Sequence, residues 1–335
     1  MNPALQGLTF IIIGVGGCIG YFYFSNVVLD KVIFPARGPK AGRNINRANM
    51  IRPWLFLFPA LLALGLYLAY PVFETLRLSL TERLPGGQSR WVGLANYQQM
   101  LGEPKFMEAL RNNMMWLIVV PALSTAFGLL AAQLTDRIRW GNVAKSIVFM
   151  PMAISFVGAA VIFKLVYDAR PINAEQIGIL NAIYLSLGGE APINWLTVPF
   201  WNNFFLMAVL VWIQTGFAMV ILSAALRGIP EETVEAAIVD GANPFQIFFK
   251  IKVPQIMGTI VVVWTTITIV VLKVFDIVYA MTNGQWETQV LANYMYDKLF
   301  RANDWGVGSA SAMVIMLLVT PILVWNVYNA RKEMR

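Results

Sequence analysis

The side chains that most often carry catalysis are scarce in this chain. It contains no histidine, and its only cysteine is Cys18. Ser–His–Asp and Cys–His catalysis are therefore excluded, and a transition-metal site is disfavoured because imidazole and thiolate are its usual ligands. A single cysteine also rules out a disulfide within the chain. We expect no catalytic residue, no metal site and no cofactor bound by this chain.

The most distinctive pattern is a pair of short helices predicted within residues 227–254. Pro230 suits the first position of a helix, and Glu231 and Glu232 fall in its first turn, where the helix dipole favours negative charge. Gly241 would end this helix, because glycine adopts positive φ without strain.

A second helix is predicted directly after this glycine. Asn243 suits its cap, Pro244 its first position, and Gln246 lies three residues after the cap, which is the spacing of a capping box. Pro254 is expected to end it. The two helices would form a rigid projection with a hinge between them.

This projection combines acidic and apolar surface, which suits insertion into a groove on another protein. The alternative is a helix pair lying flat on the membrane, which the acidic first helix disfavours because anionic lipid attracts Lys and Arg. On the first helix Glu231 and Glu235 share one side, and Ala236 and Ala237 leave room for a partner surface, while the second helix is expected to expose Phe245, Phe248 and Phe249.

Charged and polar residues inside apolar segments form a second group of candidates. Lys273 and Asp276 are three residues apart, so on a continuous helix they would share one face and could pair or line a polar path. Gln214 could hydrogen-bond the hydroxyls of a ligand, with Trp212 or Trp264 offering a ring for stacking. Helix–helix hydrogen bonding is the alternative for Gln214, and a structural pair is the alternative for Lys273 and Asp276.

The elements that must position these residues are long apolar segments. Hydrophobic residues make up 58% of the chain and charged residues only 13%, about half the share of a soluble domain. Blocks of about 18 or more apolar residues are long enough to cross a bilayer as helices. Seven stand out: Leu8–Leu29, Trp54–Leu80, Asn113–Leu134, Ala144–Tyr167, Asn203–Leu226, Met257–Ala280 and Val307–Tyr328. The sequence predicts an all-α polytopic membrane protein with about seven transmembrane helices.

The distribution of Lys and Arg predicts the orientation in the membrane. One alternating set of connections, which includes the basic stretch Arg37–Arg52, holds twice as many Lys and Arg as the other. Positive charge favours the cytoplasmic side, so the N-terminus is predicted outside and the C-terminus inside. The net charge of +7 is thus explained by membrane orientation, and we expect no nucleic-acid partner.

The first apolar block has two possible interpretations. A cleaved signal peptide carries positive charge before its apolar region, whereas here the basic run follows the block. We therefore interpret Leu8–Leu29 as a retained helix.

The residues of the projection also carry a resemblance to a known family. Glu235-Ala-Ala-x-x-Asp-Gly241, followed by Ile251-x-Val-Pro254, resembles the cytoplasmic EAA signature of binding-protein-dependent ABC importer permeases. Three external loops look like those of carbohydrate permeases: Trp91–Tyr97 with Ala109–Asn113, Gly178–Asn181 with Pro192–Leu196, and Thr282–Leu291. The last, with Asn293–Ser309, is most similar to permeases for α-glucosides.

The resemblance implies a fold, a role and a set of partners. It implies a type I (MetI-like) permease core in residues 54–335, a coupling loop at 227–256, and an added N-terminal helix with a basic loop in residues 1–53. The projection would be the coupling helix that docks on a dimer of ATP-hydrolysing subunits, which use ATP and magnesium. A homologous second permease, an external solute-binding protein and membrane lipid would be the other partners, and the substrate would be a sugar. The location would be the bacterial cytoplasmic (inner) membrane.

Two other functions remain as alternatives. An intramembrane lipid- or sugar-modifying enzyme would need convergent catalytic carboxylates, and too few are placed for that. A membrane sensor or scaffold would need neither a polar central path nor a rigid cytoplasmic projection.

At the positions where maltose permeases carry polar residues, this chain has apolar ones: Ile267, Val270, Val271 and Val274.

Overall fold

The computed structural model describes residues 3–84, 86–136 and 138–333, and in these the regular secondary structure is helical apart from one short hairpin. Among these described residues, five helices are long and apolar enough to cross a membrane, or up to seven spans if each of two bent helix pairs counts as one. This agrees with the prediction of about seven. The chain forms two compact units, Met1–Glu74 and Thr75–Arg335.

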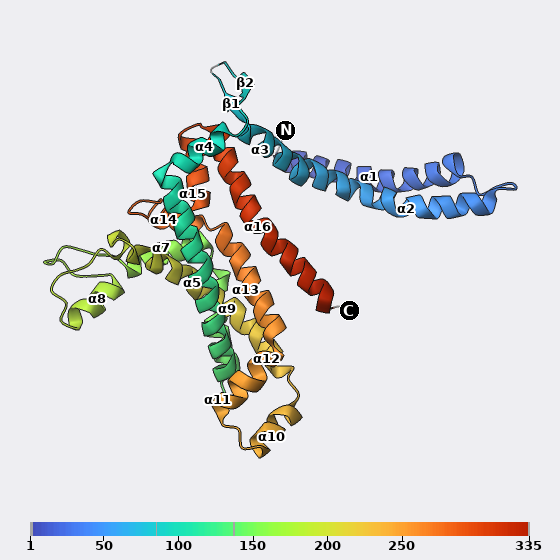
Figure 1. Ribbon diagram of the computed structural model, residues 1–335. Helices are drawn as coiled ribbons and strands as arrows, with labels where there is room; N and C mark the ends of the chain where they lie inside the picture. The colour runs from blue at the N-terminus through green and yellow to red at the C-terminus, as the bar shows by residue number, and fades with distance from the viewer. Residues whose placement is uncertain (1–2, 85, 137, 334–335) are drawn as a thin grey trace. The chain divides into compact units, whose positions relative to one another are not determined.

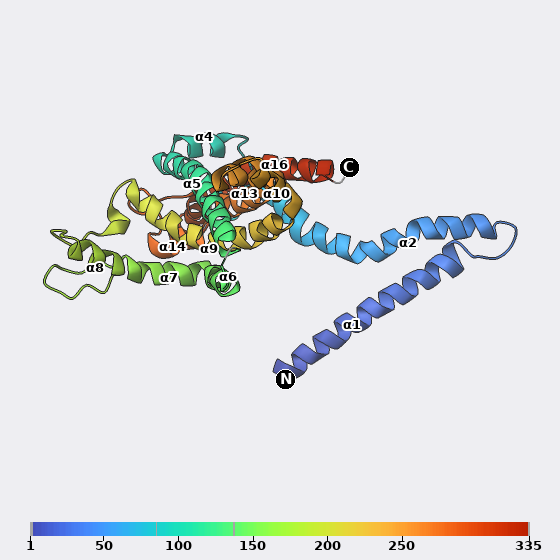
Figure 2. The same ribbon diagram turned by 90° about the horizontal axis from the view of Figure 1, so that it is seen from below.

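The first unit is a helical hairpin, in which α1 (Pro3–Val28) and α2 (Ala41–Leu64) are close near the connecting turn and diverge away from it (Figures 1 and 2). The Tyr21 hydroxyl donates to the Leu55 carbonyl at 2.9 Å, and the ring of Tyr21 stacks on Phe58. Arg52 pairs with Asp30 at 2.7 Å near the turn. Helical backbone continues from α2 through η2 (Gly65–Ala69) into α3 (Tyr70–Ser79). The remaining element of this unit is η1 (Leu29–Ile33).

The second unit is built around α5 (Pro104–Thr135), α9 (Trp201–Arg227) and α13 (Met257–Leu272), which pack together (Figure 1). Its core is apolar and draws on all three helices, for example Trp116, Leu210 and Ile267, each fully buried. Apolar side chains therefore fill the space between the spans, as they would in a soluble core.

The other elements of this unit lie around the three central helices. They are β1 (Thr81–Arg83), β2 (Ser89–Trp91), α4 (Ala95–Gly102), α6 (Gly141–Phe149), η3 (Met150–Ala153), α7 (Phe156–Val166), α8 (Ile179–Ser186), η4 (Trp195–Thr197), α10 (Glu231–Val239), α11 (Pro244–Gln246), η5 (Ile247–Lys252), α12 (Val253–Gln255), α14 (Asp276–Met281), α15 (Leu291–Tyr296), η6 (Asp297–Arg301) and α16 (Trp305–Glu333). The strands pair antiparallel, with Glu82 opposite Arg90.

One of the seven predicted spans is bent and another is interrupted. The block Ala144–Tyr167 turns by 104° between Gly141–Ala153 and Phe156–Val166, where Ser155 caps the second helix by accepting a hydrogen bond from the Gly158 amide. The block Met257–Ala280 is helical only to Leu272, and α14 is a separate helix. A continuous apolar block does not reveal such breaks, because hydropathy reports length and not backbone direction.

Small residues allow α5 and α9 to approach closely. A Cβ atom added at Gly128 would lie 2.4 Å from the Cβ of Ala218 and 2.9 Å from the Met219 amide nitrogen. These atoms belong to the backbone or sit directly on it, so rotation of a side chain would not relieve the clash.

Replacing Gly128 with valine should therefore force the α5–α9 interface apart and lower stability. We expect the melting temperature in detergent to fall, since overpacking of a close interface costs about 1–3 kcal/mol. The matched control is Gly102→Ala on α4, where an added Cβ meets nothing within 4 Å. Equal melting temperatures for Gly128→Val and the native chain would contradict the close crossing.

Candidate functional site

The predicted pair of helices is present and projects from one end of the second unit. α10 lies at the end opposite α4 (Figure 1), and it contacts η5 beside it. Glu231 begins α10 and Pro230 is its cap, one position earlier than the sequence analysis placed that proline in the helix. Ala237 is the buried residue of α10, whereas Val239 is 86% exposed.

Gly241 ends α10 in the conformation that the sequence predicted, with φ of 81°. Its amide donates to the Ile238 carbonyl at 3.0 Å, and the Ala242 amide donates to the Ala237 carbonyl at 2.9 Å. This is the double hydrogen-bond pattern of a Schellman motif, which fixes the direction in which the chain leaves a helix.

The second helix begins with the predicted capping box. The Gln246 amide donates to the side chain of Asn243 at 2.9 Å, and the Asn243 amide donates to the side chain of Gln246 at 2.8 Å. The prediction that Pro254 ends this helix is wrong: α12 includes Pro254 and continues to Gln255. The bend of 72° into α13 follows there, at Ile256.

The outer surface of this projection is apolar as well as acidic. Phe245 is 77% exposed and Phe249 is 61% exposed, while Phe248 is only half-buried against the ring of Phe249. Ile238 and Val239 of α10 are also exposed, next to Asp240. Large apolar side chains exposed together on a rigid motif are typical of a protein-binding surface.

Polar contacts join the three membrane helices at this same end. Asp136, the cap of α5, pairs with Lys145 of α6 and accepts a hydrogen bond from the buried hydroxyl of Ser223 on α9 at 3.1 Å. The Arg227 guanidinium donates to the Ser223 carbonyl at 3.3 Å. The C-terminal end of α9, after which the projection begins, is therefore joined to the end of α5 through Ser223 and Asp136. Asp136 in turn joins α5 to α6 through Lys145.

The residues predicted to line a path are not all brought together. Trp212 lines an apolar cavity of about 640 Å³ between α5, α6 and α9, together with Thr215. Gln214 is buried, and neither it nor Trp264 lines that cavity. The ring of Trp212 also packs edge-on against Phe163 of α7.

Lys273 and Asp276 do not share the face of one helix, which corrects the expectation from their spacing. α13 ends before Lys273, and Phe275 has φ of −138° and ψ of −57°, so the helix is interrupted between the two charged residues. No ion pair joins them in the part of the chain that the structure describes. Both line a cavity of about 140 Å³ at this interruption.

A cluster that the sequence analysis did not identify fixes the loop between α14 and α15. The loop contains three non-glycine residues with positive φ: Asn283, Trp286 and Glu287. Such conformations cost about 1–3 kcal/mol each and persist only when the surrounding structure holds them. Something must therefore hold this loop.

Four buried asparagines provide those contacts. Asn112 donates to the Glu287 carbonyl at 2.9 Å and to the Gln289 carbonyl at 2.8 Å, and Asn203 donates to the Glu287 carbonyl at 3.1 Å. Asn202 donates to the Trp286 carbonyl, and Asn113 accepts from the Leu291 amide. The sequence signal is the Asn–Asn pair at the start of two apolar blocks, 112–113 and 202–203.

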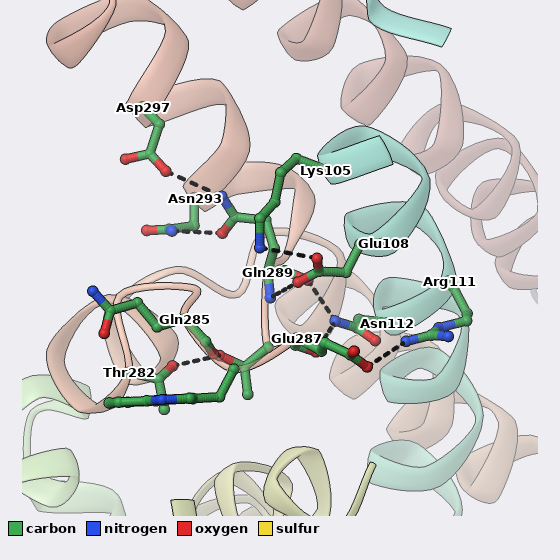
Figure 3. A network of polar contacts seen from close by, with 12 residues as sticks. Lys105, Glu108, Arg111, Asn112, Thr282, Gln285, Glu287, Gln289, Asn293 and Asp297 are labelled. Atoms are coloured by element: carbon green, nitrogen blue, oxygen red, sulfur yellow. Dashed lines mark hydrogen bonds and ion pairs between the residues drawn. The ribbon is translucent and has the colours of Figure 1, made fainter. Parts of the chain in front are cut away.

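Charged side chains surround this cluster (Figure 3). Glu108, Arg111 and Asn112 of α5 point toward the loop, where Glu108 accepts from the Gln289 amide at 3.1 Å and Arg111 lies 3.7 Å from Glu287. The Gln289 side chain continues the network to Asn293 and Asp297. The loop is thus attached to α5 on one side and to α15 on the other.

A second contact joins the start of α5 to α15. Lys298 pairs with Glu103 at 2.6 Å, and the Tyr294 hydroxyl donates to the same carboxylate at 2.8 Å. Burial acts to raise the pKa of Glu103, but the hydrogen bonds from Lys298 and Tyr294 outweigh it, so the pKa lies below its usual 4.5. The pKa of Tyr294 is raised by burial and by Glu103.

This contact predicts a pH-dependent stability. Because the folded-state pKa of Glu103 is depressed, its stabilisation is present above pH 4.5 and is lost as the pH falls through the folded-state value. Lys298→Met should lower the melting temperature at pH 7, and the difference from the native chain should shrink toward pH 3. The control is Arg90→Met, which breaks an exposed ion pair with Glu82 and should change little. A difference independent of pH would contradict this account.

The comparisons with known proteins agree with this architecture. The family model described as "Binding-protein-dependent transport system inner membrane component" matches residues 124–333. The alpha-glucoside transport system permease protein AglF of Rhizobium meliloti is 63% identical over 99% of both chains. The osmoprotective compounds uptake permease protein GgtC of Synechocystis is 48% identical over 84% of this chain and 100% of its own.

A solved structure has the same fold. It is the crystal structure of a bacterial ABC transporter involved in the import of the acidic polysaccharide alginate, and one of its chains matches with a TM-score of 0.72 and 20% identity. The match covers 88% of this chain and 99% of that chain. The family model spans more than half of this chain, and AglF matches nearly all of it. The chain therefore belongs to the binding-protein-dependent transport system inner membrane components, as a permease subunit of an ABC importer.

Proposed function

We propose that this chain forms one half of the path through which an ATP-driven importer moves an α-glucoside across the inner membrane. AglF, whose name specifies alpha-glucosides, supports the substrate class because it is 63% identical along the whole chain. In this proposal a homologous second permease forms the other half, and an external solute-binding protein delivers the sugar. The N-terminus lies outside and the C-terminus inside, and residues 1–53 are an addition to the core of 54–335.

The observation that carries the proposal is the rigid projection formed by α10 and α11. Its acidic first turn, its exposed Ile238 and Val239, and its Schellman motif at Gly241 suit insertion into a groove of an ATPase subunit. The proposed contact residues are Glu231, Glu235, Ala236, Ala237, Asp240, Gly241, Phe245, Ile251 and Pro254. ATP and magnesium bind to that partner in this proposal.

Movement of the projection reaches the membrane helices by rigid contacts. α9 leads into α10 and is attached through Ser223 to Asp136 at the end of α5. Closure of two ATPase subunits would carry the projection with it and turn α5 and α9 together, which alternates access between the two sides. The path would run past Trp212, Gln214, Trp264, Lys273 and Asp276.

Cross-linking tests the docking surface. In a Cys18→Ser background, Val239→Cys at the tip of α10 should form a cross-link to the co-expressed ATPase subunit. The matched control is Leu187→Cys, which is 82% exposed but lies after α8 in a loop predicted to be external. Cross-linking of Leu187→Cys but not of Val239→Cys would overturn the assignment.

A further inference from the structure

The interruption between α13 and α14 lies beside a group of aromatic side chains that the site residues above do not include. Lys273 and Phe275, at the interruption, line the cavity of about 140 Å³ and also a second cavity of about 320 Å³. The second cavity lies between α15 and α16 and includes Tyr296. Broken helices within membrane proteins occur where backbone lines a cavity, and they often mark binding sites.

Four aromatic rings form a continuous wall, of which Phe275 and Tyr296 line the cavity of about 320 Å³. Phe275 stacks on Tyr279, with centroids 5.0 Å apart at 27°, and both rings contact Tyr296 at 5.2 Å. Tyr296 contacts Phe300 at 5.0 Å. Phe300 is 61% exposed, and Tyr279 is also exposed, so the wall is accessible over part of its surface.

A fixed cation borders the wall. The guanidinium of Arg301 lies 5.7 Å from the ring centre of Tyr279 and 5.8 Å from that of Tyr296. It donates to the side chain of Asn283 at 3.1 Å and pairs with Asp297 at 2.9 Å, so the loop held by asparagines also orients this arginine. A guanidinium has five N–H donors, and this side chain is nearly half exposed.

The chemistry of these groups matches one class of ligand. A pyranose ring has a flat face of C–H groups and a rim of hydroxyls, so it needs an apolar platform bordered by fixed donors and acceptors. Here the aromatic wall supplies the platform. Lys273 lines both cavities, Asp276 lines the smaller one and Arg301 borders the wall, so these three supply the polar groups around it. A cavity of 320 Å³ is within the range of small-molecule sites.

We propose that Phe275, Tyr279, Tyr296 and Phe300 form a stacking platform for a pyranose ring of the transported sugar, beside the Lys273–Asp276 interruption. This rests on the proposed function, because it assigns a holding point to the substrate of that importer. The platform retains the sugar at the interruption before it moves on and so prevents its return to the outside.

The experiment uses the complete transporter in proteoliposomes, with maltose or trehalose as the sugar and a saturating amount of loaded binding protein. We expect Tyr279→Leu and Phe300→Ala to lower the sugar transported per ATP hydrolysed by roughly three- to tenfold, the effect of losing one aromatic contact. Stimulation of ATP hydrolysis by the binding protein should persist. Tyr279→Phe and Phe300→Trp keep a ring and should retain the native ratio, as should the control Tyr67→Leu at an exposed aromatic residue of the first unit.

Three outcomes would overturn the platform. They are an unchanged ratio in Tyr279→Leu and Phe300→Ala, an equal loss in the ring-retaining variants, or loss of the second permease from the purified complex, which would make the wall a subunit interface. Failure of the native transporter to import either sugar would instead contradict the proposed function. An unchanged ratio in a working transporter contradicts the platform alone.

Discussion

Replacing Gly241 with proline should abolish ATP-driven uptake while the amount of chain in the membrane stays the same. Gly241 has φ of 81°, whereas the proline ring holds φ near −65°. Proline also lacks the amide that donates to Ile238, so the substitution removes one hydrogen bond of the Schellman motif and redirects the chain after α10. Uptake in whole cells should fall by more than about tenfold, because the docking surface depends on the angle between its two helices.

Two controls separate loss of coupling from general disruption. Gly241→Asn should retain uptake, since asparagine tolerates positive φ and keeps its amide. Gly188→Pro introduces the same change at another glycine of positive φ, which follows α8 and has open space around it. It should leave uptake near the native level. Normal uptake by Gly241→Pro would contradict the role of this hinge.

Replacing Asn112 with leucine should give the largest loss of stability outside the apolar core. The side chain is 1% exposed, and its amide donates to the carbonyls of Glu287 and Gln289. The Glu287 carbonyl keeps its bond from Asn203, but the Gln289 carbonyl loses this side-chain donor. A buried acceptor deprived of its donor costs about 1–3 kcal/mol, and the strained loop is released in addition.

The measurement is the melting temperature of the purified complex in detergent. Leucine has a side-chain volume similar to that of asparagine. A lower melting temperature for Asn112→Leu therefore reports the lost hydrogen bonds rather than a cavity. Gln98→Ala, an exposed amide on the adjacent α4, should not change the melting temperature. If both variants have the same melting temperature as the native complex, the asparagines do not hold the loop.

The sequence predicted the projection formed by α10 and α11 well because its signals are local. Capping by Asn243 and the stop at Gly241 depend on residues within one turn, and both are confirmed. The apolar blocks predicted the spans for a similar reason, since crossing a bilayer requires only length and hydropathy.

What the sequence could not predict depends on contacts between distant segments. The interruption at Lys273 lies within a block that hydropathy alone predicts as a single span, and the residues around it come from α7, α9, α15 and α16. The strained loop is held by asparagines more than 80 residues away along the chain. The aromatic wall combines residues of α14 with those of α15 and η6 and has no periodic pattern of its own.

The central claim is that this chain imports a sugar when driven by an ATPase docked on α10. The most direct measurement is the uptake of radiolabelled maltose or trehalose into proteoliposomes that contain this chain, its second permease and the ATPase subunits. The account predicts accumulation that requires both ATP and the binding protein and is lost in Gly241→Pro. Accumulation without ATP, or full accumulation by Gly241→Pro, would contradict it.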